Sequence, residues 1–315
     1  MCKRRLTPTR SDCDADASGV SGPLWGEREL ANPHEATDKA GRVQRMFAAI
    51  ARSYDLNNRL HSLWRDQAWR RAAVRMADPH PHEIVLDVAC GTGDLARAFF
   101  ARPWGQRPGR VLGCDFTFPM LQLAQRKASG GSRLSSGSAP RATRPGRGTF
   151  QRRRRQGAPP APAYHAGDAL RLPVADASVD IVSIAFGIRN VADPDAALGE
   201  FRRVLRPGGR VVILEFATPV NPVIRWLDAV YREKVMPRTA TWIARDRSGA
   251  YRYLPRSVST FCDPSAMVQL MRNAGFSDVI RKSLTFGVAM CYRGCVSSAA
   301  PDVPQDEHAE SDYRR

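Results

Sequence analysis

The chain has 315 residues, 43% of them hydrophobic, which is enough to bury one large core with tails or insertions and excludes a protein that is disordered throughout. A formal net charge of +17 would ordinarily favour nucleic acid, anionic lipid or an acidic substrate as partner. Nearly half of that charge lies in one interval, residues 129–163, which has eight arginines, no acid and a Gly, Ser, Pro and Ala background. The rest of the chain is only moderately basic.

Three segments lack the apolar pattern of a core and are predicted to be disordered: an N-terminal tail at 1–38, the Arg/Gly/Ser/Pro-rich insertion at 129–163 and an acidic C-terminal tail at 295–315. One domain is predicted over 39–294, with the insertion hanging from a surface loop. No apolar stretch near the N-terminus indicates an export signal, and no run approaches the length of a membrane span. The sequence therefore favours a cytoplasmic protein that at most touches the inner face of the cytoplasmic membrane.

Cysteine and histidine usage argues against a metal. The seven cysteines are scattered, odd in number and form no CxxC pair, which disfavours a disulfide framework or a zinc site. His80 and His82 are flanked by prolines and read as a solvated loop. No metal site is predicted.

The first predicted elements are helices. From Lys39, apolar residues recur at helical spacing and predict two amphipathic helices with a break at SYDLNN, residues 53–58. Residues 83–101 then read as strand, glycine turn and helix, and residues 110–128 repeat strand, loop and helix. Two such units predict a parallel sheet.

The alternation continues after the insertion. A strand at 179–186 and a helix at 193–205 precede the turn RPGG and a strand at 210–216. A more helical stretch follows from Val223 to Met271, and two candidate strands, Val279 to Ser283 and Gly287 to Tyr292, predict a terminal hairpin. The whole predicts one doubly wound α/β domain preceded by helices.

The glycine turn, CGTGDLA at 90–96, satisfies the loose dinucleotide pattern GxGxxA, although a plain tight turn would give the same letters. Asp87 before the turn and Asp94 after it would repel a pyrophosphate. S-adenosylmethionine, which has an ammonium and a sulfonium but no phosphate, suits these acids better. Asp115, ending the next strand, is placed to accept from both ribose hydroxyls, and Asp168 from the adenine amino group. A helix cap is the alternative for each acid.

The strand at 179–186 ends on Gly187, directly before Arg189 and Asn190. The far ends of such strands are where α/β proteins bind ligands, so these side chains are candidates for a site. The alternative is a capping or surface arginine.

Several stretches together resemble class I S-adenosylmethionine-dependent methyltransferases over about residues 41 to 294, less the insertion: LDVACGTGDLA, GCD, GDALRLPVADASVDIV and RRVLRPGG. The resemblance implies a seven-stranded, mostly parallel sheet whose last strand is antiparallel. The stretches MFAAIARSYDLNNRLHS, FGIRNVADPDAALGEFRRVLRPGGRVVILEFATP, AYRYLPRSV and LTFGVAMCYRG further resemble the ubiquinone/menaquinone biosynthesis C-methyltransferases. That family methylates a ring carbon of a prenylated hydroquinone, here most directly demethylmenaquinol, with the benzoquinol step of ubiquinone biosynthesis left open.

The resemblance also implies a set of site residues. Arg189 would stabilise the quinolate or orient the group that takes its proton, Asn190 would fix a quinol oxygen, and Tyr54 would lie over cofactor and acceptor with Asp55 nearby. A core aromatic is the alternative for Tyr54. The cofactor, S-adenosylmethionine, would be held by Asp87, Gly91, Thr92, Gly93, Asp115, Asp168, Ala169 and Ala185. Ala185 stands where some relatives have a serine.

Two other functions are alternatives to a quinol methyltransferase. An RNA-binding or RNA-modifying enzyme would use QRRRRQ in the insertion, but FGIRN stands where amino-directed nucleic-acid methyltransferases carry a proline-proline-aromatic motif. An NAD-dependent oxidoreductase is disfavoured by Asp87 and Asp94. If the acceptor is a prenylated quinol, we expect peripheral membrane docking through the N-terminal helices and the segment from Trp226 to Trp242. The oligomeric state is open, a homodimer included.

Overall fold

The computed structural model describes residues 24–103, 105–134, 160–236, 238–239 and 249–298. Much of the Arg-rich insertion, all of the sequence QRRRRQ, the residue Trp242 and the acids of the C-terminal tail lie outside these ranges. Among the described residues, no helix combines the length and apolar character that crossing a membrane requires.

A seven-stranded sheet in the order β3-β2-β1-β4-β5-β7-β6 forms the centre of the fold. Its strands are β1 Ile84–Val88, β2 Arg110–Asp115, β3 Ala163–Ala166, β4 Val179–Ala185, β5 Leu205–Phe216, β6 Ser277–Leu284 and β7 Ala289–Cys295. The first five pair in parallel, and β7 is antiparallel to both β5 and β6. The predicted doubly wound α/β sheet and its terminal hairpin are confirmed.

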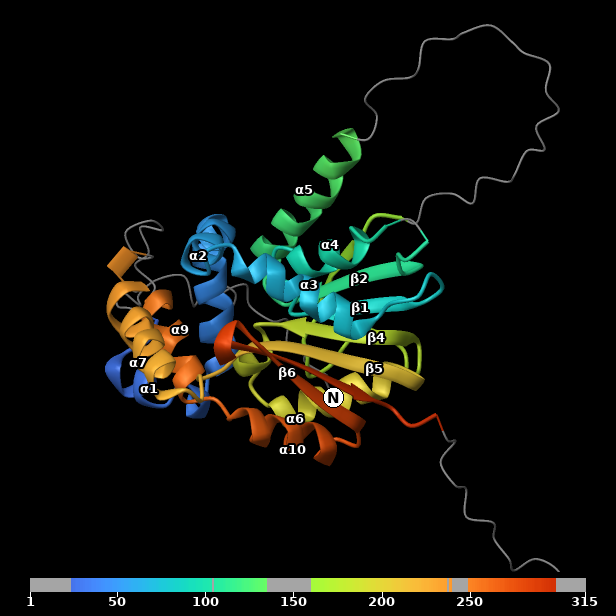
Figure 1. Cartoon of the computed structure of the whole chain (residues 1–315). Helices are drawn as coiled ribbons and strands as arrows, with labels where there is room; N and C mark the ends of the chain where they lie inside the picture. The colour runs from blue at the N-terminus through green and yellow to red at the C-terminus, as the bar shows by residue number, and fades with distance from the viewer. Residues whose placement is uncertain (1–23, 104, 135–159, 237, 240–248, 299–315) are drawn as a thin grey trace, which may run out of the picture.

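Helices cover both faces of the sheet. Figure 1 shows α3 (Arg65–Ala77), α4 (Asp94–Phe100) and α5 (Phe118–Leu134) on one face, and α6 (Pro194–Val204) and α10 (Pro264–Asn273) on the other. Helices α6 and α10 each begin after an N-cap aspartate that is followed by a proline. The carboxylates of Asp193 and Asp263 accept hydrogen bonds from backbone N–H groups of the first turn.

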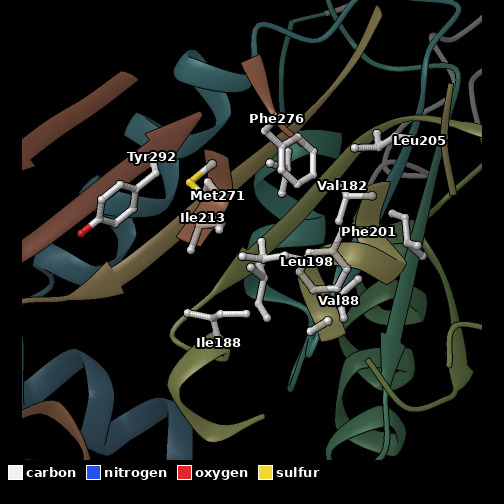
Figure 2. Close-up of a cluster of buried hydrophobic side chains, with 14 of the residues drawn as sticks. Val88, Val182, Ile188, Leu198, Phe201, Leu205, Ile213, Met271, Phe276 and Tyr292 are labelled. Carbon is white, nitrogen blue, oxygen red and sulfur yellow. The ribbon is translucent and has the colours of Figure 1, made fainter. Parts of the chain in front are cut away.

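The larger core lies between the sheet and helices α6 and α10. Figure 2 shows Phe201 and Leu198 of α6 against Val88 and Val182 of the central strands, and Met271 of α10 in the same cluster. Alternate strand residues face the other layer, where Val85 and Ile181 pack with α3 and α4. Because helices cover both faces of this parallel sheet, its strands are apolar along almost their whole length.

A third group of helices lies beside the sheet (Figure 1). Its elements are α1 (Glu27–Ala31), the 3₁₀ turn η1 (Pro33–Glu35), α2 (Lys39–His61), α7 (Pro222–Val230), the π-helical turn η3 (Tyr231–Val235) and α9 (Ala250–Ser259). Trp25 is fully buried in it and stacks on Tyr253, with ring centroids 4.2 Å apart. The predicted 1–38 tail is therefore wrong for residues 24–38, which contribute to the core.

Three other predicted boundaries shift. The helical break falls at Ser62–Trp64, where Leu63 and Trp64 have positive φ, and α2 runs without interruption through residues 53–58. The interval 129–163 begins inside α5, which continues to Leu134, and ends with Ala163 already in β3. Cys295, the first residue of the predicted C-terminal tail, ends β7.

Candidate active site

A cavity opens where β1, β2 and β4 end. Its walls come from the loops after these strands and from α2: Ala89, Gly91, Asp115, Phe116, Thr117, Met120, Gly167, Asp168, Ala169, Leu170, Ala185, Phe186, Gly187, Asn190, Val191 and Ala192, with Ala40, Val43, Phe47 and Tyr54 of α2. The carboxyl edge of a parallel sheet is the expected binding position in such folds.

Helix α2 is held over this cavity by polar contacts with the loops. The Lys39 ammonium donates to the carbonyl of Val191 (2.6 Å), and the Gln44 amide donates to the carbonyl of Phe116 (2.6 Å). Lys39 is buried, and burial together with the charge of Arg189 lowers its pKa to about 8. The roof of the cavity is thus part of the folded domain.

The glycine turn after β1 is built as the sequence predicts. Gly91 and Gly93 have φ of +55° and +79°, a backbone conformation that favours glycine. A Cβ at Gly93 would also lie 2.5 Å from the hydroxyl oxygen of Tyr164. Of the two glycines, Gly91 lines the cavity, and Gly93 lies behind it against Tyr164.

Asp115 and Asp168, the predicted ribose and adenine acids, both line the cavity. The two oxygens of Asp115 accept from the N–H groups of Gly91 and Thr117, each at 2.8 Å, which fixes the carboxylate at the end of β2. Burial raises the pKa of Asp115 above its usual value, and these two hydrogen bonds oppose the rise. Asp168 is exposed, and the predicted cofactor residues Ala169 and Ala185 lie on the same wall.

Asp87 and Thr92 lie beneath the turn rather than on the cavity wall. Asp87 is buried and accepts from the Ser183 hydroxyl (2.9 Å) and the Ala96 N–H (3.0 Å), so it ties β1 to β4 and α4. Burial raises its pKa to about 7. Thr92 donates its hydroxyl to Asp55 at 2.6 Å.

A cluster of charged groups that sequence reasoning missed links α2 to the glycine turn. The Lys127 ammonium, on α5, pairs with Asp55 and with Asp94 (2.7 Å) and donates to the Thr92 hydroxyl oxygen (2.9 Å). Burial alone would raise the pKa of Asp94, but the charges of Arg70 and Lys127 hold it below its usual value. Asp94 thus stays ionised, and the ammonium of Lys127 balances its negative charge. No local sequence signal identifies Lys127 as its partner.

Arg189 and Asn190 form a 3₁₀ turn, η2 (Ile188–Asn190), directly after β4. Arg189 is only 3% exposed, forms an ion pair with Glu215 at the end of β5, and donates to the carbonyl of Phe186 (3.0 Å). Its guanidinium is not among the cavity-lining groups, whereas Asn190 is. The structure brings the two residues together but gives only Asn190 direct contact with the cavity.

The side-chain amide of Asn190 is oriented by two partners. Its Nδ2 donates to the carbonyl of Phe186 (3.1 Å), and the hydroxyl of Tyr253 donates to its Oδ1 (3.0 Å). The second N–H of Nδ2 has no partner among the described residues. Tyr253 belongs to the stretch AYRYLPRSV, now helix α9, whose Ser257 hydroxyl also accepts from Nε of Arg189 (3.3 Å).

Tyr54 lies in the roof of the cavity, where it is partly exposed to the cavity space. Burial of its hydroxyl raises its pKa, so the group is a hydrogen-bond donor at neutral pH. Its ring contacts Phe47 edge-on at 5.8 Å. His61 bonds to the hydroxyl of Tyr231 (3.0 Å) and is absent from the cavity wall.

The chemistry of this wall fits S-adenosylmethionine. Two aspartates line the cavity, and among its described lining residues none is lysine, arginine or histidine, which a pyrophosphate would favour. Nor do the described residues contain a cluster of side chains able to hold a metal ion. Fold and site together define a class I S-adenosylmethionine-dependent methyltransferase.

Comparison with known proteins narrows this class. A sequence model of the ubiE/COQ5 methyltransferase family matches residues 35–135 and 149–296, so the chain belongs to that family. The demethylmenaquinone methyltransferase of Deinococcus radiodurans is 41% identical over 257 residues, covering 82% of this chain and 93% of the relative. The ubiquinone/menaquinone biosynthesis C-methyltransferase UbiE of Caulobacter sp. is 37% identical, covering 82% and 94%.

A solved methyltransferase supports the fold independently. The structure of an S-adenosylmethionine-dependent methyltransferase from Thermotoga maritima superposes with a TM-score of 0.51 at 16% identity, covering 80% of this chain and 99% of that one. At this identity the likeness concerns the fold alone.

Proposed function

We propose that the protein transfers a methyl group to a ring carbon of a prenylated hydroquinone, most directly demethylmenaquinol in menaquinone biosynthesis, with the benzoquinol of ubiquinone biosynthesis as a second acceptor. The observation that carries the proposal is Asn190, whose amide lines the same cavity as Asp115, Asp168 and the apolar residues of α2 and has one N–H that bonds to no described residue. The names of the relatives that are about 40% identical point to the same acceptors.

Bound S-adenosylmethionine supplies an electrophilic methyl group. The protein's part is to hold the quinol so that a hydroxyl next to the reacting carbon loses its proton to water and pushes negative charge into the ring. After the ring carbon has gained the methyl group, its own hydrogen leaves as a proton to water and the ring is aromatic again. Asn190 Nδ2 and the protonated Tyr54 hydroxyl are the donors that stabilise this quinolate oxygen. Val43, Phe47 and Val191 exclude water around the ring.

The position of Arg189 revises the role inferred for it from sequence. Its charge is balanced by Glu215 and its donors are directed at Phe186 and Ser257. We therefore propose that Arg189 holds the turn that carries Asn190 in place. Its guanidinium also contributes a positive electrostatic potential near the Asn190 amide. In this arrangement the guanidinium of Arg189 does not contact the acceptor.

The first test is methyl transfer from labelled S-adenosylmethionine to three acceptors in detergent: reduced demethylmenaquinol, the methoxy-benzoquinol precursor of ubiquinone, and total RNA. Label in one quinol identifies the pathway, and label in both indicates a dual enzyme. Label in RNA with none in either quinol would overturn the proposal and would favour an RNA-modifying enzyme that uses the Arg-rich insertion.

We further propose that the protein docks on an anionic membrane surface through a docking surface made of Leu63, Trp64, Val220, Val223, Trp226, Leu227 and Phe286, all between 55% and 88% exposed. Helix α7, which carries three of them, has no buried residue. The elements adjoin, because Tyr231 bonds to His61, and a Cβ at Gly287 would lie 3.3 Å from Pro219 Cα. Exposed Arg65 and Arg225 supply positive charge for lipid headgroups.

Replacing Trp226 and Leu227 together by serine is expected to weaken binding to phosphatidylcholine/phosphatidylglycerol vesicles by at least about tenfold, because two apolar side chains would no longer enter the lipid interface. Co-sedimentation measures the bound fraction. Ile280→Ser, at an exposed apolar position on β6, is the control and should bind like the parent. Failure of the parent protein to sediment with these vesicles would contradict the docking proposal.

A further inference from the structure

Arg70, on α3, is a buried cation whose Nε has no hydrogen-bonded partner among the described residues. Its side chain is more than nine-tenths buried, and its Nε atom is shielded from solvent with no hydrogen-bond acceptor. The carboxylate of Asp66 lies 3.9 Å from Nε, beyond hydrogen-bond distance, and is itself held by Ser62 and Gln67. Within the described part of the chain the guanidinium makes no hydrogen bond. Such a buried charge is costly unless an anion binds to it.

Arg70 is not itself a cavity-lining residue, but its guanidinium packs against one that is. Its Cζ is 5.3 Å from the centre of the Phe186 ring, and Phe186 lines the cavity at the end of β4. Its positive charge also acts on Tyr54 in the roof and on Asp87 and Asp94 on either side of the glycine turn, lowering the pKa of each against the effect of burial. Arg70 is therefore within electrostatic reach of both the turn and the roof.

The sheet order separates Arg70 from the acids assigned to adenosine. Asp115 ends β2 and Asp168 follows β3, both on one side of β1, whereas Phe186 follows β4, on the other side. A cofactor whose ribose is held at Asp115 must direct its remaining part away from these acids. S-adenosylmethionine has one anionic group, the carboxylate of its methionine part, at the end opposite the adenine.

We propose that Arg70 binds the carboxylate at the amino-acid end of S-adenosylmethionine, an inference that rests on the cofactor assigned above but not on the identity of the methyl acceptor. A guanidinium and a carboxylate form paired, charge-assisted hydrogen bonds.

The proposal is tested by binding, without any acceptor. Isothermal titration compares S-adenosylhomocysteine with its decarboxylated analogue, S-adenosyl-3-thiopropylamine, on the parent protein and on Arg70→Met. The parent should prefer S-adenosylhomocysteine by about 10- to 100-fold, the range for hydrogen bonds to a charged group. Arg70→Met should lose that preference, binding S-adenosylhomocysteine more weakly while its affinity for the analogue stays near the parent value.

Two further variants keep the result interpretable. Arg70→Lys retains the charge and should retain part of the preference, and Arg71→Met removes the exposed arginine next in the helix and should behave as the parent. Equal affinity of the parent for the two ligands would overturn the proposal even if Arg70→Met failed to fold. Loss of methyl transfer in Arg70→Met with both affinities unchanged would also overturn it, since the guanidinium would then act on the acceptor.

Discussion

Replacing Glu215 by alanine is expected to lower the free energy of unfolding by about 3–5 kcal/mol and to reduce kcat at least about 100-fold. The carboxylate is 2% exposed and is the ion-pair partner of Arg189, which is equally buried. Without it, a guanidinium would remain in the interior with only a carbonyl and a hydroxyl as acceptors. The turn that carries Asn190 would then shift or take up water.

Urea unfolding and steady-state methyl transfer measure the two effects. Asp176→Ala is the matched control, because it removes an acid paired with Arg203 at the surface, where the side chain of Asp176 is 77% exposed, and should cost less than about 1 kcal/mol. Glu215→Gln keeps the shape and a hydrogen-bonding oxygen, and we expect its kcat to lie between those of the parent and Glu215→Ala. Near-parental stability of Glu215→Ala would show that the buried pair does not hold this turn.

The doubly wound α/β sheet could be predicted because the sequence repeats one local signal. Each apolar run is followed by Gly, Asp or Asn and then by a helical period, as at Asp87 to Asp94 and again at Asp115. A helix between two strands returns the chain to the same edge of the sheet, so the strands are parallel. The antiparallel end of the sheet was expected from the family resemblance as well as from the two closing strands. The same local signals identified Asp115, Asp168 and Asn190, which line the cavity.

The predicted helix break at 53–58 was wrong because tertiary contacts override the weak helix propensity of Ser, Asp and Asn. The Asn57 amide donates to the hydroxyl of Tyr251 at 2.6 Å, and Asp55 pairs with Lys127, so these polar side chains are used while the backbone stays helical. Residues 24–38 were assigned to a tail because their few apolar side chains show no period. Trp25 stacks on Tyr253, Leu30 is buried in the same cluster, and His34 bonds to the carbonyl of Ser257, so the segment is held by contacts far along the chain.

The partners of the site residues could not be predicted, since each is chosen by distance in the fold and not by spacing in the chain. Glu215 stands 26 positions after Arg189 in an ordinary strand sequence, and Tyr253 stands 63 positions after Asn190. Sequence reasoning accordingly treated Arg189 as free to meet a ligand. The fold instead makes Asn190 the group at the cavity wall and Arg189 its support.

Replacing Asn190 by alanine is expected to lower kcat by about 10²–10³-fold, the usual loss when one preorganised donor to a developing oxyanion is removed. The affinity for S-adenosylhomocysteine should not change, because the adenosine acids lie on other loops. Tyr253→Phe removes only the hydroxyl that orients the Asn190 amide and keeps the stack on Trp25, so a loss of about tenfold is expected.

Rates with saturating quinol and calorimetric affinities for S-adenosylhomocysteine separate these effects from damage to the cofactor site. Asn273→Ala, at the exposed end of α10, is the control and should keep parental kcat and affinity. If Tyr253→Phe lost activity while Asn190→Ala retained it, the hydroxyl of Tyr253 would itself act on the acceptor. If both retained it, the free N–H of Asn190 would not be the donor on which the proposed mechanism depends, because a preorganised donor that stabilises the quinolate cannot be removed without slowing its formation.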